Sequence, residues 1–311
     1  MSVTRVDPPL TAPAVTLRRR PAWTRLGSST WYMVIPALAF YLFVVVVPSI
    51  RGGVLGFTDW NGLYPDYDFV GFDNFVEIFT TPASLEALWH TFFLAVAITF
   101  IQNGIGLLLA LGVNSRIRSR NVLRVLLFAP AVVMPVVVAY LWQYLLAPKG
   151  AINSLFAAIG MPWLAQSWLG DGNLALWSIV IAVVWQFAGY SMVIFLANLQ
   201  SIPEEVIEAS ALDGAGAWHR FWYVVRPLLA PSITINLMLS IIGGLKMFDQ
   251  VWVLTQGGPG GATETISTLL YRNAFQFGQF GYGIALGLVL TVFVAIVAGI
   301  QYRVIGRKDA E

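Results

Sequence analysis

Six long apolar stretches constrain the fold of this chain more than any other feature of its sequence. They cover about residues 31–52, 88–113, 122–146, 174–199, 229–254 and 282–304. Each stretch is long enough to cross a bilayer of roughly 30 Å as a helix. Helices are required there, because lipid offers no hydrogen-bond partner to backbone N–H and C=O groups. The pattern therefore predicts an all-α, polytopic membrane protein with six transmembrane helices.

Composition supports a lipid environment. Of the residues, 58% are hydrophobic and only 11% are charged, and the mean hydropathy is +0.73. Soluble domains carry about 25% charged residues. The net charge of +2 is too small to indicate a nucleic-acid partner. The chain has no cysteine, which excludes disulfides, thiolate catalysis and cysteine-based metal sites. We expect a lipid bilayer as the surrounding medium and no nucleic acid as a partner.

The distribution of basic residues predicts the orientation of the spans. Most of the 18 Lys and Arg residues fall on one side of the membrane, namely Arg5, Arg18, Arg19, Arg20, Arg25, Arg116, Arg118, Arg120, Arg124, Arg220, Arg226, Arg303, Arg307 and Lys308. Excess Lys and Arg marks the cytoplasmic side. Both termini are therefore predicted to be cytoplasmic. The expected organisation is a cytoplasmic tail over 1–30, a six-span transmembrane domain over 31–304 with a cytoplasmic loop over 200–228, and a cytoplasmic tail over 305–311.

The stretch "PEEVIEASALDGAGAWHRFWYVVRPLLAP" between the fourth and fifth spans is typical of two short helices joined by a turn. Ser201 and Glu204 have the spacing of a capping box, which predicts a helix start there. The first helix is expected to stop at Asp213–Gly214, where glycine can take a positive φ. The second helix is expected to end at Pro227.

One face of the first helix carries apolar and small side chains, and its glutamates lie on the other side. That face consists of Val206, Ile207, Ala209, Ser210 and Ala211. A helix with so little bulk can pack closely into a concave surface of another protein. The residues alone leave open a second interpretation, in which the hairpin only connects two spans.

The string "EASALDGAGAWHRFWYVVRPLLAP" resembles the signature loop of permease subunits of binding-protein-dependent ABC importers. The matching residues are Glu208, Ala209, Ser210, Asp213, Gly214, Ala215, Phe221, Pro227 and Pro231. Ser210 replaces the usual second alanine, and Arg226 replaces a leucine. The strings "FVGFDNFVEIF" and "VWVLTQGGPGGATETISTLLYRNAF" are similar to the carbohydrate-uptake group of the maltose and glycerol-phosphate type.

This resemblance implies a type I ABC importer permease fold that imports a sugar or oligosaccharide across the cytoplasmic membrane of a bacterium or archaeon. It also implies a second homologous permease subunit, two ATPase subunits that bind ATP and Mg, and an extracytoplasmic solute-binding protein. The segment 203–216 would be the coupling helix that contacts the ATPase. The implied contact residues are Glu204, Glu205, Glu208, Ala209, Ser210, Asp213, Gly214 and Ala215.

Motifs of enzymes are missing from the sequence. It has no G-x-x-x-x-G-K-[ST] cradle for nucleotide and no H-E-x-x-H around His90 or His219. It also has no G-x-S-x-G elbow. The string "QGGPGGATE" lacks the lysine of a phosphate loop and is expected to be a flexible extracellular turn. We therefore expect a transport subunit with no ATPase site, cofactor or metal of its own.

Polar residues inside the spans mark the expected route of the solute, because they are costly in lipid unless they line water or another helix. Span two carries Gln102 and Asn103, and span five also carries Gln250. The residues chosen for the path are Trp185, Gln186, Tyr190, Asn236, Lys246 and Asp249. Lys246 and Asp249 are three apart, so a structural ion pair on one helix face is the alternative for these two.

Two other classes of function stay open at this point. An ion-gradient-driven secondary carrier would show paired inverted repeats with broken helices, and no such symmetry is seen in the sequence. A membrane-embedded enzyme would need a catalytic cluster within the spans. Uptake driven by a pH or Na⁺ gradient without ATP would favour the carrier, and turnover by the isolated chain would favour the enzyme.

Overall fold

The computed structural model describes residues 29–115 and 118–305, and these are mostly helical. The described part contains no β-strand beyond one isolated bridge between Thr58 and Phe69. Most of the two predicted tails, with Arg116, lies outside the described residues. Backbone contacts divide the chain into two compact units, Met1–Ile50 and Arg51–Glu311.

The first predicted span is one continuous helical run that begins in the first unit. It consists of α1 (Ser29–Tyr41), a π-helical segment η1 (Leu42–Val46) and α2 (Val47–Leu55). Pro36 lies inside α1 without ending it.

The second unit contains the other spans and the short helices of their connections. Its longer elements are α4 (Pro82–Asn114), α5 (Arg120–Val132), α6 (Pro135–Leu145), α8 (Gly172–Leu199), α12 (Ala230–Leu245) and α15 (Phe280–Ile305). Its shorter elements are α3 (Asp73–Thr80), α7 (Ala151–Ala158), η2 (Pro162–Leu164), α9 (Glu204–Leu212), α10 (Ala217–Arg220), η3 (Phe221–Val225), α11 (Arg226–Leu228), α13 (Asp249–Thr255), α14 (Ile266–Tyr271) and η4 (Arg272–Gln276).

Small residues allow the central helices of this unit to pack closely. A Cβ at Gly106 of α4 would lie 2.7 Å from the Cβ of Ser191 in α8. A Cβ at Gly244 of α12 would lie 2.7 Å from the Cα of Ala95 in α4. Close backbone approach over small residues is the usual way in which membrane helices associate. α4 is therefore the central helix, with α8 on one side and α12 on another.

Two of the predicted spans are bent pairs of helices. Among the described residues, four helices are long and apolar enough to cross a membrane, and up to six spans result if each bent pair is counted as one. α5 and α6 meet at an angle of 98° across Val133 and Met134. Pro135 begins α6 and cannot continue a helix from α5, since it has no N–H and disfavours helical geometry in the residue before it.

The fifth predicted span differs from the expectation at both ends. Pro227 does not end the second hairpin helix, which continues to Leu228 after the π-helical segment η3. A 70° bend at Leu229 then leads into α12. α12 ends at Leu245, and α13 begins only at Asp249.

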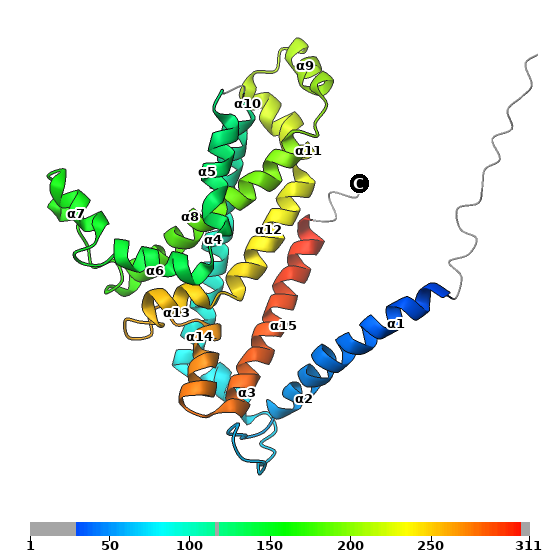
Figure 1. The fold of residues 1–311 in the computed structure, drawn as a ribbon, viewed down its shortest axis with the longest axis vertical. Coiled ribbons are helices and arrows are strands. Elements are labelled where there is room, and N and C mark those ends of the chain that lie inside the picture. The colour runs from blue at the N-terminus through cyan, green and yellow to red at the C-terminus, as the bar shows by residue number, and fades with distance from the viewer. Residues whose placement is uncertain (1–28, 116–117, 306–311) are drawn as a thin grey trace, which may run out of the picture. The chain divides into compact units, whose positions relative to one another are not determined.

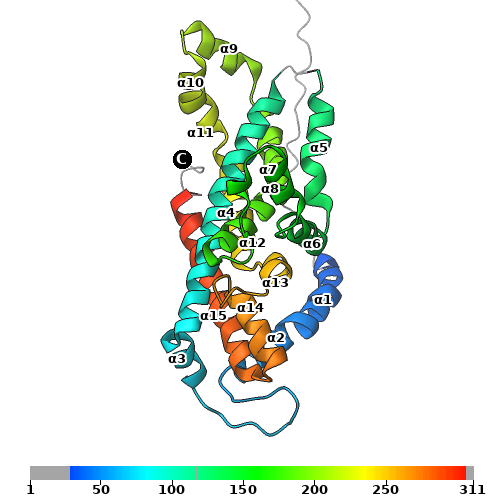
Figure 2. The same ribbon diagram turned by 90° about the vertical axis from the view of Figure 1, so that its left-hand side faces the viewer.

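The hairpin of α9 and α10 lies at one end of this unit, and α3 and α14 lie toward the opposite end (Figures 1 and 2). The helices α4, α8 and α12 run between the two ends (Figure 1). The fold thus places the α9–α10 hairpin and the connections that contain α3 and α14 at opposite ends of the helical core (Figure 1).

Candidate transport cavity and helical hairpin

The first hairpin helix starts differently from the prediction. Pro203 is the N-cap of α9, and no side chain caps the helix. The Ser201 hydroxyl donates instead to the carbonyl oxygen of Asn198 at 2.8 Å, at the end of α8. The predicted capping box is therefore wrong. Glu204 and Glu205 do lie in the first turn, where negative charge favours a helix.

The end of α9 is the predicted glycine turn. Gly214 has φ +81°, and no atom would touch a Cβ there, so the requirement for glycine is conformational. The N–H of Ala215 donates to the Ser210 carbonyl, and the N–H of Gly214 donates to the Ala211 carbonyl. These two bonds form a Schellman motif, which satisfies the last carbonyls of the helix.

The hairpin exposes large apolar side chains at its tip. Leu212 is 89% exposed and Trp218 is 74% exposed. Ser210, by contrast, is buried, and its hydroxyl donates to the Ile207 carbonyl at 2.7 Å. Of the implied contact residues, Ser210 therefore lies inside the hairpin. The others are exposed, apart from the half-buried Ala215.

A cavity of about 750 Å³ lies between the hairpin and the ends of α4, α5 and α8. Two acidic residues of α9, Glu204 and Glu208, line it together with Arg120 and Arg220. Both signs of charge thus surround this space.

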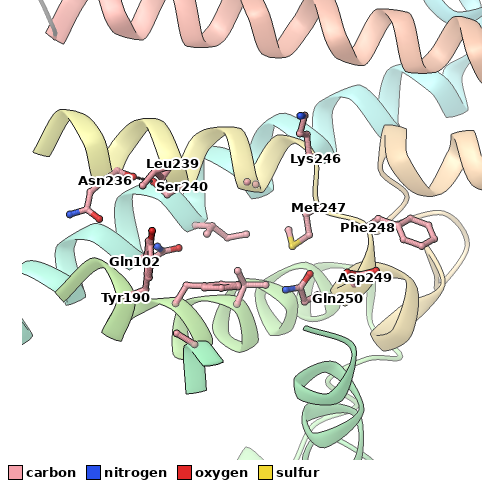
Figure 3. A pocket seen from close by; sticks show the side chains of 16 residues that line it. Gln102, Tyr190, Asn236, Leu239, Ser240, Lys246, Met247, Phe248, Asp249 and Gln250 are labelled. Atoms are coloured by element: carbon pink, nitrogen blue, oxygen red, sulfur yellow. Dashed lines mark hydrogen bonds between the residues drawn. The ribbon is translucent and has the colours of Figure 1, made fainter. Parts of the chain in front are cut away.

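A cavity of about 520 Å³ lies among α4, α8, α12 and the segment between α12 and α13 (Figure 3). Its polar lining residues are Gln102, Tyr190, Asn236, Ser240, Lys246, Asp249 and Gln250. Apolar side chains such as Ile98, Val183 and Leu239 complete the wall. Amides, hydroxyls and apolar surface in one cavity match a ligand that has both hydroxyl groups and apolar faces.

Neutral hydrogen bonds hold the helices around this cavity. Gln102 of α4 donates to the Ser191 hydroxyl of α8 at 2.8 Å. Asn103 of α4 donates to the Ser240 hydroxyl of α12 at 2.8 Å, and Asn236 donates to the Ser191 carbonyl at 3.4 Å. These bonds join all three helices without any buried charge.

Four of the six residues chosen for the solute path line this one cavity, namely Tyr190, Asn236, Lys246 and Asp249. The structure does not bring Trp185 and Gln186 to it. Trp185 lies in a separate apolar groove and packs edge-on against Trp142, with ring centroids 5.9 Å apart. Gln186 is fully buried in the protein core. Contact of any of these side chains with a solute stays a prediction.

Lys246 and Asp249 do not form the structural ion pair that was the alternative for them. The break between α12 and α13 separates them, so they do not share a helix face. Figure 3 shows the Lys246 side chain pointing away from the other labelled groups. Within the described residues the one ion pair joins Arg272 to Glu264 at 2.6 Å.

Three polar lining residues were not chosen from the sequence: Gln102, Ser240 and Gln250. Gln102 and Gln250 carried a usable signal, because both are amides inside apolar spans. Ser240 carried none, since serine is frequent at helix contacts in membranes.

The glycine-rich string "QGGPGGATE" forms a turn, as predicted. Gln256, Gly257, Gly260 and Gly261 all have positive φ. Thr263 at its end is fully buried, and its hydroxyl bonds both the Gly258 carbonyl and the Thr255 hydroxyl. The nearby Glu264 is also buried. This turn is thus attached to the core by its last residues.

Comparison with known proteins places the chain in a family. Residues 102–309 match the family described as "Binding-protein-dependent transport system inner membrane component". A probable starch degradation products transport system permease protein, AmyD of Thermoanaerobacterium thermosulfurigenes, is 33% identical over 90% of this chain and 95% of its own length. The multiple sugar-binding transport system permease protein MsmF of Streptococcus mutans is 32% identical over 88% of this chain and 93% of its own.

A solved structure shares the fold. The chain matches a bacterial ABC transporter involved in the import of the acidic polysaccharide alginate, with a TM-score of 0.78 and 22% sequence identity, over 90% of this chain and 95% of that one. This similarity confirms the predicted all-α importer permease fold. From the family match, the full-length relatives and the shared fold together, we conclude that this chain belongs to the binding-protein-dependent transport system inner membrane components, the permeases of sugar ABC transporters.

Proposed function

We propose that this chain forms half of the translocation path of an ATP-driven importer for a sugar or oligosaccharide, in the cytoplasmic membrane of a bacterium or archaeon. The observation that carries the proposal is the 520 Å³ cavity with its neutral amides and hydroxyls, inside the segment that matches the family. Sugars present hydroxyl groups to amides and apolar ring faces to side chains such as Tyr190.

The other subunits of the importer are separate chains. A second homologous permease completes the path, and an extracytoplasmic solute-binding protein delivers the solute. The solved structure of the alginate transporter in complex with its solute-loaded periplasmic protein supports such a partner. Two ATPase subunits bind ATP and Mg and close on each other.

The hairpin transmits the movement of the ATPase subunits to the spans. Its exposed Leu212 and Trp218 fit an apolar cleft on another protein. Its second arm continues through the bend at Leu229 into α12, which carries Asn236 and Ser240 of the cavity. A displacement of the docked hairpin therefore reaches the cavity wall directly.

The test is uptake into proteoliposomes that contain the chain with its partner subunits, the binding protein outside and ATP inside. Radiolabelled maltose, trehalose, lactose and diacetylchitobiose are offered in turn. We expect uptake of at least one sugar that depends on internal ATP, and a loss of tenfold or more in Asn236→Ala. Trp185→Phe, away from the cavity, is the matched control and is expected to transport normally. Uptake by the chain alone under an ion gradient would instead establish a secondary carrier.

Docking of the hairpin is tested separately by co-purification of the ATPase. Gly214→Asp forces a side chain into the left-handed region and is expected to abolish co-purification while the chain still inserts in the membrane. Gly216→Ala is the control, because Gly216 has an ordinary φ and open space around it. Normal co-purification of Gly214→Asp would contradict the docking role.

A further inference from the structure

Gln186 is an amide enclosed in the apolar core around α8. It is 0% exposed, and its neighbours Val183 and Val184 belong to the hydrophobic cluster between α4, α6, α8 and α13. A buried amide is costly unless it is hydrogen-bonded, and in a membrane protein no lipid group replaces the missing partner. The partners of Gln186 therefore define its role.

The first partner is the backbone at the 98° bend. The Nε2 of Gln186 donates to the Val133 carbonyl oxygen at 2.9 Å. Val133 caps α5, and the last carbonyls of a helix lack partners within the helix. Pro135 follows two residues after Val133 and has no N–H to offer. Gln186 thus supplies a donor that the bend itself lacks.

The second partner lies beyond the other helix break. Gln250 donates from Nε2 to the Oε1 of Gln186 at 3.3 Å. Gln250 is the second residue of α13, is 6% exposed and lines the 520 Å³ cavity. Because a backbone carbonyl can only accept, the amide must turn Nε2 toward Val133 and leave Oε1 for Gln250. The Gln186 side chain is therefore hydrogen-bonded both at the α5–α6 bend and just after the break between α12 and α13.

A second glutamine side chain, that of Gln143, joins α6 to α13. Gln143 of α6 donates from Nε2 to the Val253 carbonyl of α13 at 2.9 Å. α6 and α13 also pack against each other. α6 and α13 are thus joined by both packing and a hydrogen bond, and Gln186 of α8 hydrogen-bonds the residue that ends α5, two positions before α6, and the second residue of α13.

We propose that Gln186 is a positioning residue, which fixes the α6–α13 pair, and with it the wall of the cavity formed by residues 246–250, relative to α8. Its amide does not contact the transported solute. Because the importance of this wall for transport depends on the proposed function, the first test measures distances rather than uptake.

Spin-label distances test the proposal in the complete transporter, with its partner subunits, in lipid nanodiscs. The chain has no cysteine, so introduced ones are its only thiols. One pair, Tyr144→Cys with Phe100→Cys, measures α6 against α4. The control pair, Phe100→Cys with Val193→Cys, measures α8 against α4. All three positions are exposed in the chain. Gln186→Met removes both hydrogen bonds and keeps the length of the side chain.

We expect Gln186→Met to broaden the α4–α6 distance distribution at least twofold and to leave the α4–α8 distribution unchanged. Gln143→Met is the matched amide control and is expected to give less than half of that broadening, because the bond to Val133 stays in place. An unchanged α4–α6 distribution, or equal broadening of both pairs, would overturn the proposal. If Gln186→Met gives no monodisperse complex, Gln186→Leu, which also removes both hydrogen bonds, is measured with the same pairs, and an unchanged α4–α6 distribution there overturns the proposal as well.

Uptake then separates positioning from solute contact. With any sugar that the transporter accepts, Gln186→Met is expected to lower the maximal rate about tenfold, with half-saturation within twofold of the wild type. A shifted half-saturation at an unchanged maximal rate would assign Gln186 to solute binding and refute the positioning role.

Discussion

The packing of α5 on α8 at Gly189 gives the sharpest stability prediction. A Cβ at Gly189 would overlap the Leu127 carbonyl oxygen and would lie 2.6 Å from the Leu127 carbonyl carbon. Real Cβ contacts essentially never fall below 3.0 Å, so the two helices would have to move apart. Both atoms that are met belong to the backbone, so no side-chain rotation can relieve the clash.

The change is Gly189→Ala, and overpacking of this kind typically costs about 1–3 kcal/mol. At 1.4 kcal/mol for each factor of ten, that corresponds to a fall of roughly 5- to 150-fold in the folding equilibrium constant. The assay is unfolding of the purified chain in mixed micelles with increasing SDS, followed by tryptophan fluorescence. The midpoint is expected at clearly lower SDS than for the wild type.

Gly104→Ala is the control, because Gly104 lies in α4 and no atom comes within 4 Å of the place that an alanine methyl group would take. Alanine is the better helix former, so this variant is expected to match or slightly exceed the stability of the wild type. Equal midpoints for Gly189→Ala and Gly104→Ala would refute the reasoning from close packing.

Three further outcomes are expected. Arg272→Met should lower the SDS midpoint more than Glu264→Gln does, because Arg272→Met leaves the buried Glu264 carboxylate without its cation. Equal shifts of the midpoint in the two variants would contradict this. Tyr282→Phe and Ser84→Ala each remove a buried bond of 2.8 Å at a cost of about 1 kcal/mol, and the double variant should lose less than the sum; strict additivity would show that the two groups do not interact. Leu212→Cys should react with a membrane-impermeant maleimide in inverted vesicles only, and labelling in right-side-out cells would reverse the predicted topology.

Hydropathy located the apolar stretches that form the long helices but not the breaks within them. Hydropathy reports whether a segment is apolar, and Val133 and Met134 at the 98° bend are as apolar as the helices beside them. The usable signal was Pro135, which disfavours a helix through the residue before it. At the second break, Lys246 and Asp249 stood out as charges in a span, but they were interpreted as neighbours on an unbroken helix.

The choice of path residues on α8 was limited by the character of that helix. α8 is apolar on all sides, so its periodicity gave no direction toward the cavity. Tyr190 faces the cavity, whereas Trp185 and Gln186 lie on other faces, and only the packing of α4 and α12 decides between them. Similarly, Ser201 had the right spacing for a cap, but the end of α8 competes for its hydroxyl.

The bend at Leu229 has a mechanical consequence. Leu229 is 0% exposed and is packed within a cluster that includes Phe195 and Val113. The helix bends by 70° at Leu229, and the packing around Leu229 holds this corner in place, so the corner can act as a pivot. With this corner as a pivot, a force along the helix that ends at Leu228 turns α12, which begins at Ala230, sideways. A small displacement of the hairpin is thereby redirected across the helical core instead of along it.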